Sequence, residues 1–267
     1  MKLACPLVCF AALLAAQGAL AQLRNDGLVQ SPADPKEFII PDSGWRLWPD
    51  TQASWQNDTL YLPDQVNLSQ LPVNAPTGGW DMLTSSNGIS VKLPASVEQY
   101  YWGQLSLRPY NNSAGWDEYD YASNDPEVKN GAYQGVSWFW RSIDVPSSFN
   151  SAEVTLRIRA FRQRVEVYVN QQLVGYDLIA ETSYDCNIAK ALKPGQQNII
   201  ALRITNPGGT YDWIDFAFSQ IKWGNYMFSA GRGIGGLDRG LTLRAHDSVS
   251  LSDTWALNTP QTTTVNA

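Results

Sequence analysis

The sequence predicts an all-β protein, built as an antiparallel sandwich in which two sheets share one core. Three observations support this prediction. Apolar and polar residues alternate over several short stretches, glycine and proline interrupt the chain every several residues, and almost no stretch keeps helical spacing for a dozen positions. Many short strands separated by turns at such spacing are typical of an antiparallel sandwich.

The clearest predicted strand lies at residues 154–160, where four apolar side chains alternate with Thr155, Arg157 and Arg159. A strand with one buried face and one wet face has this pattern. The next strand places three valines of residues 165–169 on one face and Glu166 and Tyr168 on the other.

A hairpin is predicted to follow, with Asn170-Gln171 as its turn and residues 172–176 as its second arm. Further strands are expected at residues 200–204, after a Lys-Pro-Gly turn, and at residues 241–244. Between them, Asn187 can cap a single helical turn that runs through Leu192.

The composition excludes several classes of protein. The 267 residues are 44% hydrophobic, 12% aromatic and only 16% charged, which is typical of a folded chain with a real core and not of a disordered one. The net charge of −6 repels the phosphate groups of DNA and RNA, so nucleic acid is not expected as a partner.

Residues 1–21 are predicted to be a signal peptide. Lys2 gives a positive start, residues 7–14 form a short apolar run, and Ala19-Leu20-Ala21 ends in the small-x-small pattern of a cleavage site. The apolar run is too short to span a bilayer. We therefore expect a secreted or periplasmic protein with no membrane partner.

The mature chain is expected to hold one sandwich domain at residues 22–247, with an aromatic-rich first part. Residues 248–267 are expected to begin an immunoglobulin-like domain that is cut short, or a linker. Cys186 is the one cysteine beyond the leader. It has no partner for an intramolecular disulfide, and it is predicted to be a buried, inert thiol.

Four arginines at residues 157, 159, 162 and 164 allow two interpretations. They can form a basic patch for an anionic sugar or nucleic acid, or they can line a solvated sheet face. Their alternation with apolar residues favours the solvated face.

Aromatic residues are concentrated at residues 45–80 and 100–140, which are expected to be loops. Ring faces on rigid loops suit the apolar faces of sugars, and neighbouring Asp, Asn and Gln side chains can bond to hydroxyls. The alternative is that these rings pack as wedges under long loops, and for any single Trp packing is the favoured interpretation.

An ordered series of short motifs resembles the amino-terminal sugar-binding domain of glycoside hydrolase family 2, which includes β-galactosidases, β-glucuronidases and β-mannosidases. The series covers residues 135–245. Residues 45–102 also resemble the first segment of a secreted, divergent branch of this family. The motifs are GVSWFWR at 135–141, VP at 145–146, VYVN at 167–170, VGYD at 174–177, ALKPG at 191–195, Asn198, RITNPGG at 203–209, YDW at 211–213 and GGLDR at 235–239.

The resemblance implies a jelly-roll sandwich of the galactose-binding-domain-like type. It also implies a parent enzyme that continues into an immunoglobulin-like domain and a (β/α)8 barrel holding two catalytic carboxyl groups about 5 Å apart. A barrel needs about 250 residues, which this chain cannot supply beside the sandwich. The nearby Asp117, Glu118 and Asp120 are interpreted as loop charges, although a catalytic pair or a calcium site is the alternative.

The resemblance also suggests where a sugar can be held. In relatives, an Asp six residues before the Gly of a Gly-Ile-x-Arg segment bonds a substrate hydroxyl, but here that position is Ala230. Asp212, Asp215 or Asp238 can take this role instead, or none of them does, and Asp215 is the preferred candidate. For each of the three, a structural salt bridge is the alternative role. The candidates for carbohydrate binding are Asp215, Asp212, Trp213, Asp238 and Trp116.

Other motifs point to no further chemistry, and no catalytic residue, cofactor or metal is expected. Gly231, Gly233 and Gly236 match a dinucleotide fingerprint, but a strand-like segment follows them instead of a helix. His246 is the only histidine and is expected to lie in a linker, so a histidine-cluster metal site is impossible.

The sequence therefore predicts a non-catalytic, carbohydrate-binding amino-terminal domain of a secreted glycoside hydrolase that acts on β-linked sugars. Its expected partners are a glycan or small sugar and the remaining domains of the parent enzyme. Two alternatives stay open, a free-standing lectin-like module and a purely structural domain.

Overall fold

The computed structural model describes residues 36–84, 86–101, 104–105, 133–179, 181–207, 211–212, 217–218, 220–229 and 235–246. All described residues belong to one compact unit of the chain. The predicted boundaries after residues 21 and 247 lie outside the described residues and stay predictions. Within the described ranges, no helix has both the length and the apolar character needed to cross a membrane.

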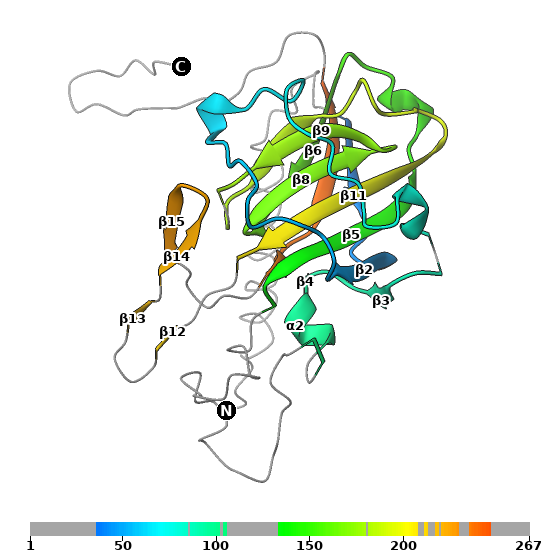
Figure 1. Ribbon diagram of the computed structural model, residues 1–267. Coiled ribbons are helices and arrows are strands. Elements are labelled where there is room, and N and C mark those ends of the chain that lie inside the picture. Colours follow the sequence, from blue (N-terminus) through cyan, green and yellow to red (C-terminus); the bar gives the residue numbers. More distant parts are fainter. Residues whose placement is uncertain are drawn as a thin grey trace, which may run out of the picture. The chain divides into compact units, whose positions relative to one another are not determined.

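The fold is an all-β, antiparallel sandwich, as the sequence predicts (Figure 1). The larger sheet has six strands, in the order β3 (Ile89–Val91), β2 (Trp45–Asp50), β5 (Gly135–Asp144), β11 (Gln197–Asn206), β8 (Arg164–Val169) and β9 (Gln172–Asp177). The smaller sheet has four strands, in the order β1 (Lys36–Ile40), β17 (Leu241–His246), β6 (Glu153–Ile158) and β10 (Tyr184–Asn187).

Short elements complete the described part of the chain. Three strands form a small sheet in the order β4 (Ala95–Ser96), β16 (Gly236–Leu237) and β7 (Phe161–Arg162). Two further pairs are β12 (Tyr211–Asp212) with β13 (Ala217–Phe218), and β14 (Gln220–Trp223) with β15 (Tyr226–Ser229). The helical elements are α2 (Val97–Tyr100) and the 3-10 turns η1 (Pro63–Gln65), η2 (Trp80–Met82) and η4 (Ser147–Phe149).

The predicted hairpin is confirmed. β8 pairs with β9, and the turn residues Asn170 and Gln171 have φ of 49° and 69°. Positive φ at both central residues is what a two-residue hairpin turn of the favoured twist requires. The single turn after β10 is also confirmed, since Asn187 Oδ1 accepts a bond from the Ala189 N–H at 2.9 Å and the Leu192 N–H donates to the Ile188 carbonyl at 3.0 Å.

The core lies between the two large sheets and explains the alternating sequence pattern. The three valines of β8 point into it together with Phe139 of β5, and Leu156 of β6 and Leu243 of β17 meet them from the other sheet. Leu156, Leu243 and Phe139 are fully buried. One face of each large sheet is therefore buried in this shared core.

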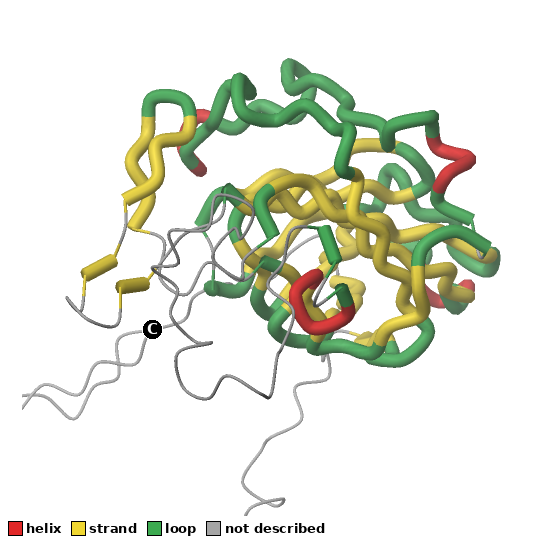
Figure 2. Tube along the Cα trace, turned by 60° about the horizontal axis from the view of Figure 1, so that its bottom comes forward, coloured by secondary structure: helices red, strands yellow, loops and turns green. Residues whose placement is uncertain are grey.

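The outer face of the six-stranded sheet is covered as well. Residues 51–84, here called the covering segment, leave β2 and cross that face before the chain returns as β3 (Figures 1 and 2). Leu83 packs against Trp138 of β5 and Tyr168 of β8, and Leu60 packs against Tyr176 of β9. Every residue of β8 is therefore buried, on both faces of the strand.

The structure corrects two expectations from the sequence, one about the arginines and one about the aromatic residues. Arg164 is only 1% exposed, so the arginines of residues 157–164 do not share one solvated face, although Arg157 and Arg159 lie nearer the surface. The aromatics of residues 45–80 and 100–140 are not all in loops, because Trp45 lies on β2 and Trp138 on β5. The sheet also holds Trp48 and Trp140. The packing interpretation is confirmed for Trp45 and Trp138, which are fully buried.

Three smaller expectations have mixed outcomes. Cys186 is buried and free, and burial raises the pKa of its thiol, as expected of an inert cysteine. His246 is the last residue of β17 and not part of a linker, because the strand continues past the predicted end at residue 244. Gly231 and Gly233 lie outside the described residues, whereas Gly236 lies on a strand, where an added Cβ would be 2.3 Å from the Ala95 carbonyl oxygen.

Candidate functional site

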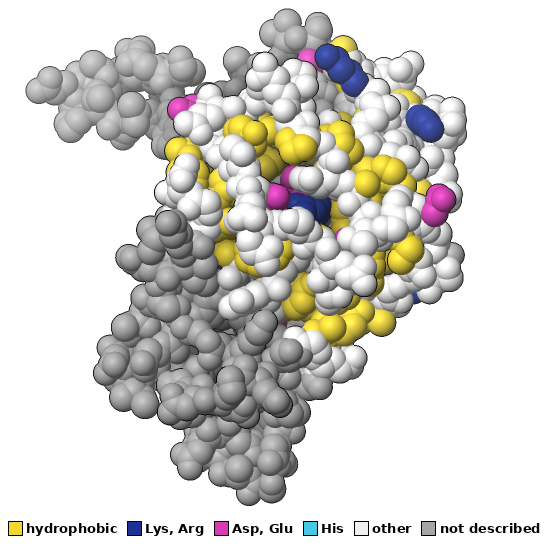
Figure 3. Space-filling model, in the orientation of Figure 1, with side chains coloured by type: hydrophobic (Ala, Val, Ile, Leu, Met, Phe, Trp, Pro, Cys, Tyr) yellow, Lys and Arg dark blue, Asp and Glu magenta, His cyan; other side chains and the backbone are white. Residues whose placement is uncertain are grey.

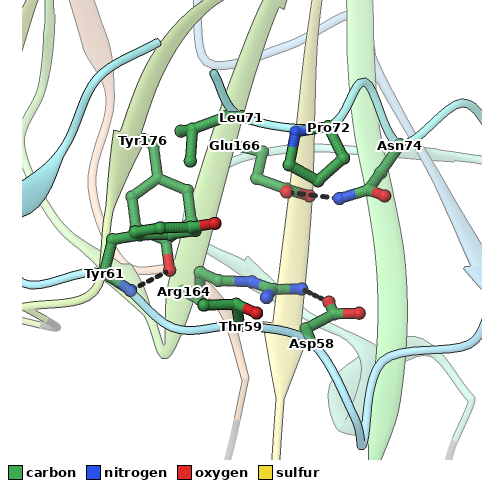
Figure 4. Close-up of a pocket in the computed structure, with 9 residues that line it drawn as sticks. All are labelled: Asp58, Thr59, Tyr61, Leu71, Pro72, Asn74, Arg164, Glu166 and Tyr176. Atoms are coloured by element: carbon green, nitrogen blue, oxygen red, sulfur yellow. Dashed lines mark hydrogen bonds and ion pairs between the residues drawn. The ribbon is translucent and has the colours of Figure 1, made fainter.

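A pocket opens between the covering segment and the edge of the six-stranded sheet, with a volume of about 70 Å³ (Figure 4). β8 and β9 supply its floor, and the covering segment supplies its walls and rim. Figure 3 shows basic and acidic side chains side by side near the middle of this face, with hydrophobic side chains around them. The residues that line the pocket are Asp58, Thr59, Tyr61, Leu71, Pro72, Asn74, Arg164, Glu166 and Tyr176.

Three charged side chains that line the pocket, Asp58, Arg164 and Glu166, form a network with the neighbouring Arg203. Arg164 bonds to Asp58 Oδ2 at 2.5 Å, and Arg203 on the neighbouring strand β11 bonds to Glu166 at 2.7 Å. Arg203 also lies 3.8 Å from Asp58 Oδ2. Two guanidinium groups and two carboxylates leave no net charge on this network, which is necessary because three of the four side chains are almost fully buried.

Neutral groups satisfy most of the remaining hydrogen-bonding capacity. Asn74 donates to Glu166 at 2.7 Å, Arg164 donates to the Thr205 hydroxyl at 2.9 Å, and Arg203 donates to the Ser54 carbonyl at 3.1 Å. Burial opposes the charge on Arg164, but the carboxylates of Glu166 and Asp58 outweigh it and hold the pKa of this guanidinium above its ordinary value. The network therefore ties the covering segment to the sheet.

Aromatic side chains close one end of the pocket. The Tyr61 and Tyr176 rings meet edge to face with centroids 5.8 Å apart, and the Tyr61 N–H donates to the Tyr176 hydroxyl at 3.2 Å. The Arg164 guanidinium carbon lies 4.8 Å from the ring centroid of Trp223, at cation–π distance. The pocket thus combines charged hydrogen-bonding groups with apolar ring surface, which is the pairing that polar ring-shaped ligands require.

The local sequence explains how these groups reach the pocket. β8 alternates strictly, so the arrangement that sends its valines into the inter-sheet core sends Arg164 and Glu166 to the opposite face. Asp58 follows a turn in which its own N–H donates to the Trp55 carbonyl at 3.1 Å, and this turn brings its carboxylate down onto Arg164.

Of the residues predicted to bind carbohydrate, Asp238 does not line this pocket. Asp215, Trp213 and Trp116 lie outside the described residues. Asp212 lies on β12, in register with Ala217 of β13.

Asp238, the remaining predicted residue, is exposed just after β16, where its N–H donates to the Ala160 carbonyl at 3.2 Å. Partial desolvation raises the pKa of its carboxyl group, and the nearby Glu181 adds to this effect. The sequence prediction missed the pocket, although the polar residues that alternate with the valines of β8 were a signal for it.

A second buried polar group lies at α2. Glu98 accepts hydrogen bonds at Oε1 from the N–H groups of Tyr133, at 2.7 Å, and Gly235, at 3.4 Å, so that it joins three distant parts of the chain. Its Oε2 is buried without a partner. Desolvation raises the pKa of this carboxyl group above its usual value of 4.5, although the hydrogen bonds oppose the shift.

Glu98 is expected to make stability depend on pH. A carboxyl group whose pKa is higher in the folded state favours folding most below its unfolded pKa, and the advantage is lost as the pH rises through the folded pKa. The free energy of unfolding of the wild type, relative to a Glu98→Gln variant, is thus expected to fall as the pH rises above 4.5. Urea titrations of both proteins between about pH 4 and pH 7 measure this difference. If the free energy of unfolding of the wild type rises with pH relative to that of Glu98→Gln, the expectation is wrong.

No group of three or more His, Cys, Asp or Glu side chains is placed to share a metal ion in the part of the chain that the structure describes.

Comparisons with known proteins give partial matches. No family model matches the chain. A β-glucuronidase of Formosa agariphila is 22% identical over 111 residues, which are 41% of this chain and 11% of that protein. The chain therefore spans only a small part of the curated relative that it matches.

Solved structures of β-glucuronidases also match in part. The Lactobacillus rhamnosus enzyme gives a TM-score of 0.48 at 15% identity, over 81% of this chain and 29% of that one. The Ruminococcus gnavus enzyme gives 0.45 at 15%, over 82% and 30%, and a calcium-binding mutant of Bacteroides uniformis β-glucuronidase 2 gives 0.43 at 17%, over 79% and 18%. This chain spans less than a third of each.

Proposed function

We propose that this chain is the amino-terminal, non-catalytic sandwich domain of a larger secreted glycoside hydrolase that acts on β-linked sugars. Three findings support the proposal: the ordered motifs of residues 135–245, the antiparallel sandwich, and the match to one ninth of a β-glucuronidase. In this role the domain packs beside a separate catalytic barrel, shapes the rim of its pocket and helps to hold the glycan.

The observation that carries the non-catalytic part of the proposal is the pairing of charges in the pocket. Retaining glycoside hydrolysis needs one free carboxylate as nucleophile and one protonated carboxyl group as acid. Asp58 and Glu166 are each bonded to an arginine, at 2.5 and 2.7 Å, so neither carboxylate is free to act as the nucleophile. Such a pair suits binding and positioning better than nucleophilic attack.

Two assays of the purified chain test this role. With the nitrophenyl β-glycosides of glucuronic acid, galactose and mannose we expect no turnover, and with glycans we expect saturable binding. Turnover that stays with the protein through a further purification step and is lost on heat denaturation would contradict the proposal. The parent enzyme is tested separately by sequencing the gene beyond the codon of Ala267, where a barrel with paired glutamates is expected.

A free-standing lectin-like module is the second candidate, and the pocket is the observation that favours it. It shares the expected glycan binding but predicts a stop codon soon after Ala267. A purely structural domain predicts no glycan binding at all.

A further inference from the structure

The pocket has apolar surface on one of its two sides. In Figure 4, Leu71 and Pro72 lie on one side of the space, next to the hydrogen-bonded Glu166 and Asn74, and Arg164 with Asp58 lies on the other. Tyr61 and Tyr176 lie at one end. A ligand that fits must therefore present an apolar surface to one side and hydrogen-bonding groups to the other.

The polar side keeps hydrogen-bonding capacity that the protein does not use. Both contacts of Asp58 with arginines involve Oδ2, and its side chain is 23% exposed, so Oδ1 remains available as an acceptor. Arg164 lines the same space, but its side chain is almost fully buried, so Asp58 is the charged group that a ligand can reach. An unused carboxylate oxygen beside an open pocket indicates a site that a hydrogen-bond donor on a ligand completes.

The charge balance selects among polar ligands. The two guanidinium groups are already neutralised by Asp58 and Glu166, so an additional carboxylate or phosphate would face an uncompensated excess of negative charge. A hydroxyl group has no charge and both donates and accepts hydrogen bonds. A polyol can therefore bond to the Asp58 carboxylate without disturbing the ion pairs.

The volume limits how much of the ligand enters. At about 70 Å³ the pocket is smaller than the cavity of about 150 Å³ that encloses a benzene molecule. One edge of a sugar ring fits, and the rest of the ring must stay at the rim, where Thr59 and Pro72 are exposed.

We infer that this pocket binds one edge of a neutral hexopyranose, with a ring hydroxyl on Asp58 and the apolar ring face against Leu71 and Pro72. The inference rests on the proposed function, since it names the site and the ligand class for the glycan that the domain is proposed to hold.

A matched pair of leucine variants tests the site. Leu71→Trp fills the pocket from its lining, whereas Leu68→Trp adds the same ring at an exposed position of the same segment that does not line the pocket. Binding of methyl β-D-galactopyranoside, methyl β-D-mannopyranoside and methyl β-D-glucuronide is measured by saturation-transfer NMR. We expect a neutral hexoside to bind the wild type and Leu68→Trp alike, and Leu71→Trp at least about tenfold more weakly.

The outcomes separate the site from the proposed function. Equal binding to Leu71→Trp and the wild type would overturn the pocket assignment and leave the sugar-holding role intact. Tighter binding of the glucuronide than of either neutral sugar would overturn the ligand class. Absence of binding to the wild type would overturn both. If Leu71→Trp does not fold by circular dichroism, Thr59→Trp at the exposed rim replaces it, with the same expected loss.

Discussion

Replacing Arg203 with methionine is expected to lower the free energy of unfolding by about 3–5 kcal/mol, because removing one member of a buried ion pair leaves the other charge without compensation. The side chains of Arg203 and Glu166 are 3% and 4% exposed, and 2.7 Å separates their bonded atoms. Methionine has a similar length, so little of the loss comes from a cavity. Urea unfolding followed by circular dichroism measures the change.

A surface ion pair between an arginine and a carboxylate provides the control. Arg157 bonds to Asp185 through two nitrogens, at 2.7 and 2.6 Å, but these side chains are 35% and 42% exposed. Arg157→Met is therefore expected to cost less than about 1 kcal/mol. Equal losses for the two variants would show that burial of the Arg203 pair does not determine its contribution.

Truncating Phe139 to alanine is the second change with a large expected effect. Phe139 lies on β5, is fully buried between the sheets, and stands in register with Leu47 of β2 and Leu202 of β11. A Phe→Ala change in a packed core removes apolar contacts and leaves a cavity, which costs about 3–5 kcal/mol. The same urea titration measures this loss.

The adjacent strand supplies a control for Phe139. Ile199 of β11 is 40% exposed, so Ile199→Ala removes a side chain that buries little surface. We expect its effect to stay within about 0.5 kcal/mol. A Phe139→Ala loss of the same size would mean that the inter-sheet core does not provide the main stabilisation of the sandwich.

The strands could be predicted from the sequence where each signal is local. The alternation over residues 154–158 and the two-residue turn at Asn170 depend on neighbours in the chain, and both are confirmed. The prediction failed at Arg164, because strict alternation indicates two different faces but not whether the polar face meets water or another part of the protein. Here the covering segment lies on it.

The pocket could not be predicted because its parts are far apart in the chain. Asp58 and Arg164 are separated by 106 positions, and Arg203 lies 149 positions after its partner Ser54. No spacing rule connects residues at such distances without a known strand order. Asp212, Asp215 and Asp238 were chosen instead from a resemblance between short motifs, and three of the five residues predicted to bind carbohydrate lie outside the described residues.

The position of residues 51–84 within the chain has a consequence for how such a domain can diversify. β2 and β3 are adjacent and antiparallel, so the whole excursion is a detour between two strands that a short turn could join. Lengthening a surface connection adds little loop-closure entropy. A different detour can therefore connect the same two strands, provided that it also covers Trp138 and Tyr168, and it can change the chemistry displayed on that side without altering the strand order.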